Sequence, residues 1–337
     1  HNTWLDKHAN KFSPAPASLI SASAFRNDFM EVVNKDLVRS GSIYALPFYV
    51  DTLALYYNKT LFNSAGLVNP PKTWEDFNSA VKELTQKNSG VIGRAGVGLG
   101  TAGNVNYAPD ILSLLMLQTG TVMVSNDAKT ATFDQAVSSD NKTYSPGQSA
   151  LDFYTSFANS AKPVYTWNIR MINSLDVFLQ GKSAMYIGYA KDIPVIQKKG
   201  LNYGVAAIPQ IKDSKKDASY IDINFATYSA GAVTQKSANK NAAWDFLVFA
   251  TGANAAGTYL QKSLLPPARR DLIQFVQNHE VLSVFGRQAL SASSWPQPDE
   301  AEVSKIFARM IDSVALGQSN SKEALKEAAI EVTNLLK

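Results

Sequence analysis

The sequence predicts an α/β protein in which helices cover β-sheets, and three observations indicate this class. Short runs rich in β-branched and aromatic residues alternate with helical patterns through the first two thirds of the chain. From residue 239 onward the pattern is almost entirely helical. The chain has 337 residues, 45% hydrophobic and 18% charged, an ordinary globular composition with enough length for two domains. A barrel or a sandwich would not show this order of elements.

The expected strands are short and bounded by turn residues. Two of them come early, at 43–49 and 53–57, and the chain reaches Pro70-Pro71 soon after them. Later strands are expected at 96–99, 184–187, 203–208 and 227–233.

The helices follow from their boundary residues and their apolar periodicity. Thr73 is expected to begin the first helix because its hydroxyl can cap the first turn, with Asp76 three residues later. Gly120, Gly181 and Gly200 each follow a helical pattern and are expected to end a helix. Further helices are expected at 109–118, 147–159, 172–180, 192–198, 239–250, 253–262, 270–277, 281–291, 300–316 and 321–336.

Composition excludes several classes of function. The 32 Lys+Arg against 28 Asp+Glu give a net charge of +4, and no run of five basic residues occurs, which argues against nucleic-acid binding. Cysteine is absent, so thiol nucleophiles, disulfides and cysteine-based metal sites are excluded. The three histidines are scattered, and we expect no metal and no cofactor. No apolar stretch has the length of a membrane span.

Motifs for catalysis are weak. The stretch Gly98-Leu99-Gly100-Thr101-Ala102-Gly103 formally matches the dinucleotide pattern. The next helix is expected only at 109, so its N–H groups would not face a pyrophosphate, and we interpret the stretch as a glycine-rich loop. No pair of carboxylates stands out as a glycosidase acid and nucleophile. We therefore expect no catalytic residues, with a glycoside-active enzyme as the alternative.

Aromatic residues in loops are the most informative positive feature. Trp74 and Trp244 lie on helical apolar patterns and are expected in the core, whereas Trp4, Trp167 and Trp295 lie among polar residues or prolines. An aromatic ring in a loop can stack on the C–H face of a sugar, while Asn, Asp and Arg bind its hydroxyls. Each of these rings could instead fill a domain edge.

A family resemblance extends this interpretation. The segment 41–59, GSIYALPFYVDTLALYYNK, and the segment 70–77, PPKTWEDF, closely resemble the extracellular solute-binding proteins of bacterial carbohydrate ABC transporters, the group that includes maltodextrin-binding proteins. FLQGKSAMYIGY at 178–189 resembles the FxxGKxAM segment of that family. The strand at 228–233 with the helix from 239, and the C-terminal helices after Leu316-Gly317, also agree in order.

The resemblance implies a two-lobe periplasmic-binding-protein-like fold with hinge strands and an interlobe cleft. The first lobe would comprise 1–50 and 228–292, and the second 53–223 and 298–337. The hinges would lie near 51–52, 224–227 and 293–297.

Family members begin with a signal or lipoprotein peptide and then a strand, a helix and a second strand, before the segment that His1-Asn2-Thr3-Trp4 resembles. We therefore expect that the N-terminal portion is missing and that the first-lobe sheet is incomplete. The resemblance also implies a periplasmic or extracellular location, with a lipid anchor through the missing N-terminus.

By resemblance, the function is that of a monomeric receptor of an ABC importer, which closes on a sugar or oligosaccharide and delivers it to permease subunits. A binding protein of the same fold for another solute, such as an oligopeptide, a polyamine or iron, is the alternative. The ligand-binding residues are expected to be Asn2, Trp4, Asp51, Asn106, Tyr107, Trp167, Tyr189, Asp192, Asn224 and Trp295.

Overall fold

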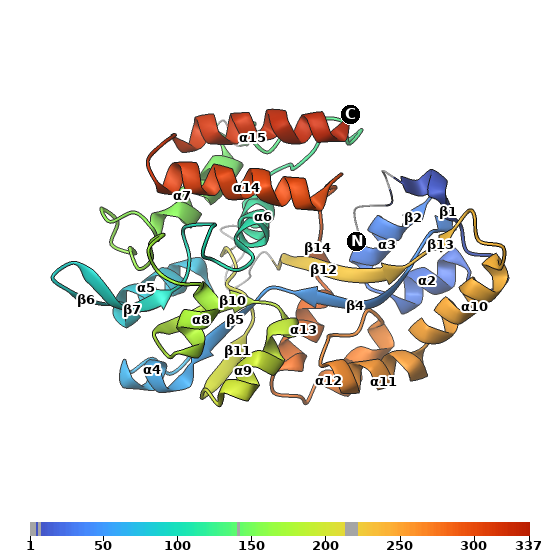
Figure 1. Ribbon diagram of the computed structural model, residues 1–337, viewed down its shortest axis with the longest axis horizontal. Helices are drawn as coiled ribbons and strands as arrows, with labels where there is room; N and C mark the ends of the chain where they lie inside the picture. The colour runs from blue at the N-terminus through green and yellow to red at the C-terminus, as the bar shows by residue number, and fades with distance from the viewer. Residues whose placement is uncertain (1–4, 6–7, 140–141, 213–221) are drawn as a thin grey trace. The chain divides into compact units, whose positions relative to one another are not determined.

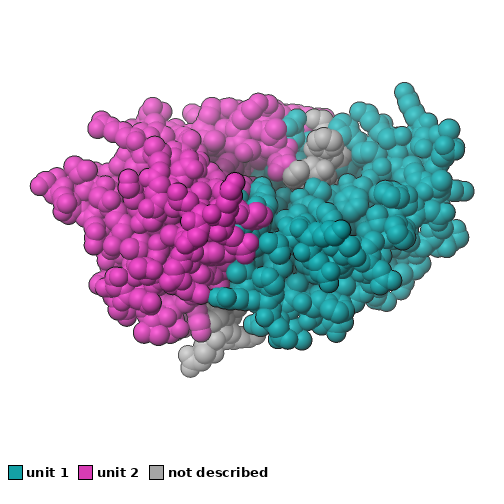
Figure 2. Space-filling model, turned by 60° about the horizontal axis from the view of Figure 1, so that its bottom comes forward, with its two compact units in different colours: residues 1–53, 189–193, 224–299 teal, residues 54–188, 194–223, 300–337 magenta. Residues whose placement is uncertain are grey.

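A computed structural model describes residue 5 and residues 8–139, 142–212 and 222–337 (Figure 1). The chain divides into two compact units, coloured separately in Figure 2. Unit 1 comprises His1–Leu53, Tyr189–Ile193 and Asn224–Asp299. Unit 2 comprises Ala54–Gly188, Pro194–Ile223 and Glu300–Lys337.

Unit 1 is organised around a three-stranded sheet in the order β14-β12-β4. The long central strand β12 (Asn224–Gly231) pairs antiparallel with β4 (Leu46–Thr52) and parallel with the short β14 (Ala292–Ser293). The register of β12 and β4 shifts between Ser229 and Ala230, opposite Pro47. Proline has no N–H to donate to a ladder, so the irregularity explains how this strand contains one.

Helices surround the sheet of unit 1 (Figure 1), and its core contains large side chains of helices and strands alike, among them Phe25, Val50, Tyr228 and Trp244. The helices are η1 (Ala9–Lys11), α2 (Ala22–Asp28), α3 (Glu31–Leu37), η2 (Ala190–Asp192), α10 (Lys240–Thr251), α11 (Ala253–Ser263), η3 (Arg270–Leu272), α12 (Ile273–Val276) and α13 (Leu282–Ala289). Two small ribbons complete the unit, β1 (Phe12–Ser13) with β13 (Val233–Thr234) and β2 (Val38–Arg39) with β3 (Ser42–Ile43).

Unit 2 contains a mixed five-stranded sheet in the order β11-β5-β10-β7-β6. Its central strand β10 (Ser183–Gly188) is buried along its whole length, and β5 (Ala54–Asn58) beside it is nearly so. Strands buried on both faces read as continuous apolar runs, which is why both segments were detectable in the sequence. At one edge, β6 (Gln86–Asn88) is exposed and polar, as edge strands commonly are. The remaining strands are β7 (Val91–Val97) and β11 (Tyr203–Ala206).

Helices of unit 2 pack against this sheet and against each other (Figure 1). They are α4 (Lys59–Ser64), α5 (Trp74–Leu84), α6 (Ala108–Gln118), α7 (Pro146–Ser156), α8 (Ser174–Leu179), α9 (Ile193–Lys199), α14 (Glu300–Ala315) and α15 (Ser321–Leu336), with a short β8 (Val137–Ser139) and β9 (Lys142–Tyr144) hairpin. The tryptophans expected in the core, Trp74 and Trp244, are both buried.

The boundary residues behave as predicted. The Thr73 hydroxyl accepts the N–H of Asp76 at 3.0 Å, so the predicted cap of α5 is confirmed. Gly120, Gly181 and Gly200 follow helices with φ of 80°, 68° and 71°, the left-handed conformation expected of a helix-ending glycine. Several predicted boundaries need correction. The first strand begins at residue 46 rather than 43, the strand expected at 96–99 spans 91–97, and the strand expected at 227–233 begins at 224. The helices α2, α3 and α4 were not expected because they are too short to show a clear period.

Candidate functional site

The candidate ligand-binding residues fall into three groups. Asp51, Tyr189, Asp192, Asn224 and Trp295 belong to unit 1, and Asn106, Tyr107 and Trp167 belong to unit 2. Asn2 and Trp4 lie outside the described residues. The first two groups are described below by their contacts within their own unit.

Asp51 lies near the end of β4 and is 1% exposed. Its Oδ1 accepts the N–H groups of Thr52 at 2.9 Å and Ala190 at 3.0 Å, and its Oδ2 accepts the N–H of Lys191 at 3.2 Å. Burial raises the pKa of Asp51 to about 7, against the lowering effect of these three N–H groups. The carboxylate thus braces the chain at this point, and its protonation changes near neutral pH.

The segment that Asp51 holds contains two further candidates. Tyr189 precedes η2 and is buried, and the Lys191 ammonium lies 5.1 Å from the centre of its ring. Asp192 is also buried, and its charge adds to the rise in the pKa of Asp51. Asp51, Tyr189 and Asp192 therefore form one cluster, although 137 residues separate Asp51 from Tyr189 in the sequence.

Asn224 and Trp295 are held by other contacts of unit 1. The buried Asn224 amide donates to the Ser291 hydroxyl at 2.8 Å, which gives it a structural partner. Trp295 is 3% exposed and follows Ser294, whose hydroxyl donates to the carboxylate of Asp36 at 2.6 Å. The Tyr228 hydroxyl donates to the same carboxylate at 2.7 Å. Asp36, which sequence reasoning missed, thus fixes the residue before Trp295.

In unit 2, Asn106 belongs to a network of neutral polar groups. Its amide nitrogen donates to the Tyr186 hydroxyl at 3.3 Å, and its amide oxygen accepts from the amide of Asn173. Its backbone N–H donates to the Ser174 hydroxyl at 3.0 Å. Asn173 caps α8 by accepting the N–H of Leu175 at 3.0 Å. An asparagine before a helix is a recognisable cap, but nothing local indicates its contact with Asn106.

Tyr107 stands at the start of α6 with φ of 58°. A bulky non-glycine residue rarely adopts this left-handed conformation, which costs on the order of 1 kcal/mol or more. Such strain is common where a loop must present a side chain in a fixed direction. The observation is consistent with a functional role for this loop.

Trp167 is completely buried within unit 2, and its indole N–H donates to the Asn104 amide oxygen at 3.0 Å. A Cβ placed on Gly98 would lie 3.2 Å from the indole ring, so the glycine makes room for it. Asn104 also donates to the carbonyls of Asn168 and Met171, at 3.0 and 2.8 Å. Packing explains this loop tryptophan, and its contact with ligand stays a prediction.

The glycine-rich loop at 98–103 is occupied by a group of the protein itself. The N–H groups of Ala102 and Gly103 donate to the Asp312 carboxylate of α14, at 2.7 and 3.1 Å. The carboxylate takes the donors that a phosphate would need. The interpretation of this segment as a loop, rather than a dinucleotide site, agrees with these contacts.

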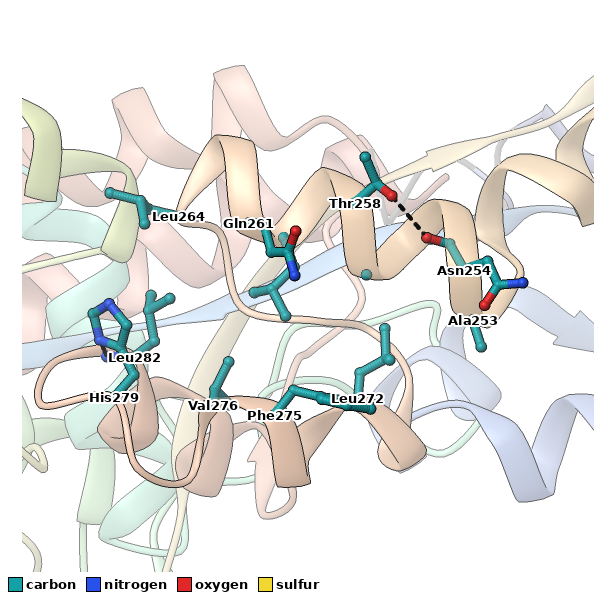
Figure 3. Close-up of a pocket in the computed structure, with 12 residues that line it drawn as sticks. Ala253, Asn254, Thr258, Gln261, Leu264, Leu272, Phe275, Val276, His279 and Leu282 are labelled. Carbon is teal, nitrogen blue, oxygen red and sulfur yellow. Dashed lines mark hydrogen bonds between the residues drawn. The ribbon is translucent and has the colours of Figure 1, made fainter.

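A groove of about 540 Å³ lies in unit 1 between α11 on one side and α12 with the start of α13 on the other (Figure 3). Apolar side chains such as Phe275 and Leu264 line it together with Gln261 and His279. None of its lining residues is a candidate from the sequence. It therefore offers an alternative location against which the candidate residues can be tested.

Within residues 5, 8–139, 142–212 and 222–337, no three His, Asp or Glu side chains gather as ligands for a metal. Across the same residues, no helix has the length and apolar content needed to span a bilayer.

Comparisons with known proteins agree with this architecture. The family model described as bacterial extracellular solute-binding protein matches residues 17–281. A binding protein of Brucella abortus is 24% identical over 339 residues, which cover 99% of this chain and 78% of the relative. The galactooligosaccharide-binding protein of Bacillus subtilis is 23% identical over 294 residues, which cover 85% of this chain and 64% of the relative.

Solved structures show the same fold. The sugar-binding protein MalE from Xanthomonas citri has a TM-score of 0.80 at 19% identity, with 99% of this chain and 82% of that one covered. UgpB from Mycobacterium tuberculosis in complex with glycerophosphocholine has a TM-score of 0.75 at 17% identity, covering 99% and 81%. The predicted two-lobe periplasmic-binding-protein-like fold is confirmed. The family model covers well over half of the residues of this chain. The chain therefore belongs to the bacterial extracellular solute-binding protein family.

Proposed function

We propose that the protein is the receptor of an ABC importer, and that it captures a sugar or oligosaccharide for delivery to a membrane permease. Family membership supports the receptor function. The observation that supports a carbohydrate as the ligand is the uncharged hydrogen-bond network of unit 2. In this network Asn106, Asn173 and Tyr186 bring amide and phenol groups together. Sugar hydroxyls both donate and accept hydrogen bonds, as amides do. The galactooligosaccharide-binding relative and the sugar-binding structure support the same class of solute.

Unit 1 would supply the charged and aromatic part of the site. Asp51 and Asp192 offer carboxylate acceptors for hydroxyls, and Tyr189 offers a ring beside them. Asn224 lies where the chain returns to unit 1 and Trp295 lies near the point where it leaves again, so we include both as further contacts. Ligand binding would favour the conformation in which these contacts form.

Four further residues complete the proposed site. Trp167 would support the ligand site by packing against the loop that contains Asn104. Asn2 and Trp4 would contact the ligand, as the family resemblance implies. Tyr107 is included because it follows Asn106 in the same loop and has a left-handed backbone conformation.

The alternative is a different solute, and the glycerophosphocholine complex of UgpB is its support. A phosphodiester would require cationic side chains at the site, whereas the network around Asn106 is uncharged. A glycoside-active enzyme is the third possibility, and family membership argues for a receptor instead. We further propose that the protein acts outside the cytoplasmic membrane, held there by a lipid anchor.

Calorimetry with maltotriose, a galactooligosaccharide and glycerophosphocholine tests the proposal. We expect one of the sugars to bind, and Asn106→Ala to weaken its affinity about tenfold, the effect of losing a hydrogen bond or two. The control is Asn63→Ala, an exposed asparagine of the same unit, which should leave the affinity unchanged. Binding of glycerophosphocholine alone, or an unchanged affinity in Asn106→Ala, would contradict the proposal.

A further inference from the structure

The last turn of α13 contains a buried glutamine that no sequence pattern indicated. Gln288 is 5% exposed, and its amide nitrogen makes two hydrogen bonds of 2.9 Å. One reaches the Thr52 hydroxyl and the other the carbonyl of Leu53. Both donor hydrogens of the amide are therefore used on the last two residues of unit 1 before the chain enters unit 2.

The residues after α13 hold a second strand in the same way. The Ser291 hydroxyl accepts from the Asn224 amide at 2.8 Å, and the Ser291 carbonyl accepts the N–H of Asn224 at 3.4 Å. Asn224 is the first residue of unit 1 after the chain returns from unit 2. One helix end thus anchors both β4 and β12 where they reach the boundary of the unit.

This anchor is rigid because α13 packs closely on α12. A Cβ added to Gly286 would lie 2.9 Å from the Val276 side chain and 3.4 Å from that of Ile273. Such distances leave no room for a side chain at this position. The neighbouring Phe285 is fully buried. The position of Gln288 is therefore set by the packing of α13 on α12 as well as on the strands that it binds.

Thr52 connects the glutamine to Asp51. Its hydroxyl accepts from Gln288, while its own N–H donates to Oδ1 of Asp51 at 2.9 Å. We propose that Gln288 is a positioning residue of the ligand site, which fixes the Asp51 carboxylate by holding Thr52 in place. The inference rests on the proposed function, in which Asp51 contacts the ligand.

The titration of Asp51 reports on this arrangement without any ligand. The groups that face the carboxylate are the N–H groups of Thr52, Ala190 and Lys191 and the nearby charge of Asp192. The Thr52 N–H lowers the pKa of Asp51, because it stabilises the ionised form. Release of Thr52 should weaken that bond, so that the carboxylate titrates at higher pH.

The experiment compares Gln288→Met and Thr52→Val with wild type by carbon-13 NMR of the Asp51 carboxyl in the ligand-free protein. Met keeps the size of the glutamine but donates nothing, and Val keeps the N–H of residue 52 but loses the hydroxyl. We expect the Asp51 midpoint to rise by about 0.5 to 1 pH unit in both variants. The second variant keeps the test available if Gln288→Met fails to fold.

Two matched variants separate positioning from general loosening. Ser291→Ala releases Asn224 but not Thr52, and Gln277→Met changes an exposed glutamine at the end of α12. Both should leave the Asp51 midpoint unchanged. In calorimetry with the best sugar, Gln288→Met should bind severalfold more weakly than Gln277→Met. Midpoints that stay at the wild-type value in folded Gln288→Met and Thr52→Val would overturn the inference. Absence of any sugar binding would instead count against the proposed function and leave the titration result standing.

Discussion

The polar clusters of the two units hold their central side chains by different means. In unit 1, the Asp51 carboxylate is bound by three backbone N–H groups and lies beside Asp192. In unit 2, Asn104 and Asn106 are bound largely by side chains and carbonyls, all of them neutral. A carboxylate in a buried site responds to pH, whereas an amide network does not. The two clusters can therefore be perturbed separately. A change of pH should affect the cluster of unit 1, and truncation of an amide side chain should affect that of unit 2.

The largest expected effect is the pH dependence of stability that Asp51 imposes. Its pKa is about 7 in the folded protein against 3.8 for an aspartate free in water, so the folded state keeps a proton that the unfolded state has lost. Asp51 should therefore make the free energy of unfolding fall as pH rises from about 4 to 7, by at most about 4 kcal/mol. Urea denaturation across this range should show the fall in wild type and a smaller fall in Asp51→Asn.

The comparison between the two proteins isolates one residue, because every other titrating group is shared. The expected result is that Asp51→Asn gains stability relative to wild type as pH rises. A constant difference between the two curves from pH 4 to 8 would show that Asp51 ionises normally. The two clusters would then not differ in their response to pH.

The next effect belongs to unit 2 and should be independent of pH. Asn104→Ala removes the acceptor of the buried Trp167 N–H and the donors to the carbonyls of Asn168 and Met171. Leaving a buried donor unpaired costs roughly 1–3 kcal/mol, so we expect a loss of about 2 to 3 kcal/mol at both pH 5 and pH 8. Urea denaturation at the two pH values measures it.

Trp167→Phe provides the partner variant in this test, because it removes the indole N–H and keeps an apolar ring. It should restore part of the stability when combined with Asn104→Ala, since the indole N–H is then no longer present as an unpaired donor; the Thr101 hydroxyl, which also donates to Asn104, still loses its acceptor. Additive losses in the double variant would mean that the two side chains do not act as a pair.

Local chemistry explains what the sequence predicted well. The Thr73 cap and the helix-ending glycines are set by neighbouring residues, and strands such as β10 are buried on both faces and read as apolar runs. The helices α2 and α3 were missed because seven residues show too little of a period. The loop that carries Trp167 was predicted and burial of its ring was left open as an alternative, but the hydrogen bond to Asn104 was not foreseen.

The candidate site was only partly predictable for the same reason. Asp51 was selected by its place in a family segment, but its partners at 190 and 191 are brought there by the fold. Gln288 and Asp36 were missed because nothing near them in the sequence indicates that they bind Thr52 or Ser294. Hydrogen bonds between residues far apart in the sequence produce no periodic sequence pattern. The residues that position a site are therefore harder to predict than those that end a helix.

The smallest expected effect concerns the groove beside α11, which belongs to neither cluster. Gly257 lines it, and a Cβ placed there would have only the Leu272 side chain within reach, at 4.0 Å. There is room for a Cβ at this position, so Gly257→Leu should place its side chain in the groove, and replacing a helical glycine should raise stability by up to about 1 kcal/mol. Sugar affinity in calorimetry should match wild type, because both clusters stay intact. A loss of sugar binding in a variant that is at least as stable would place the ligand in the groove, and Asp51 and Asn106 would then be parts of the scaffold.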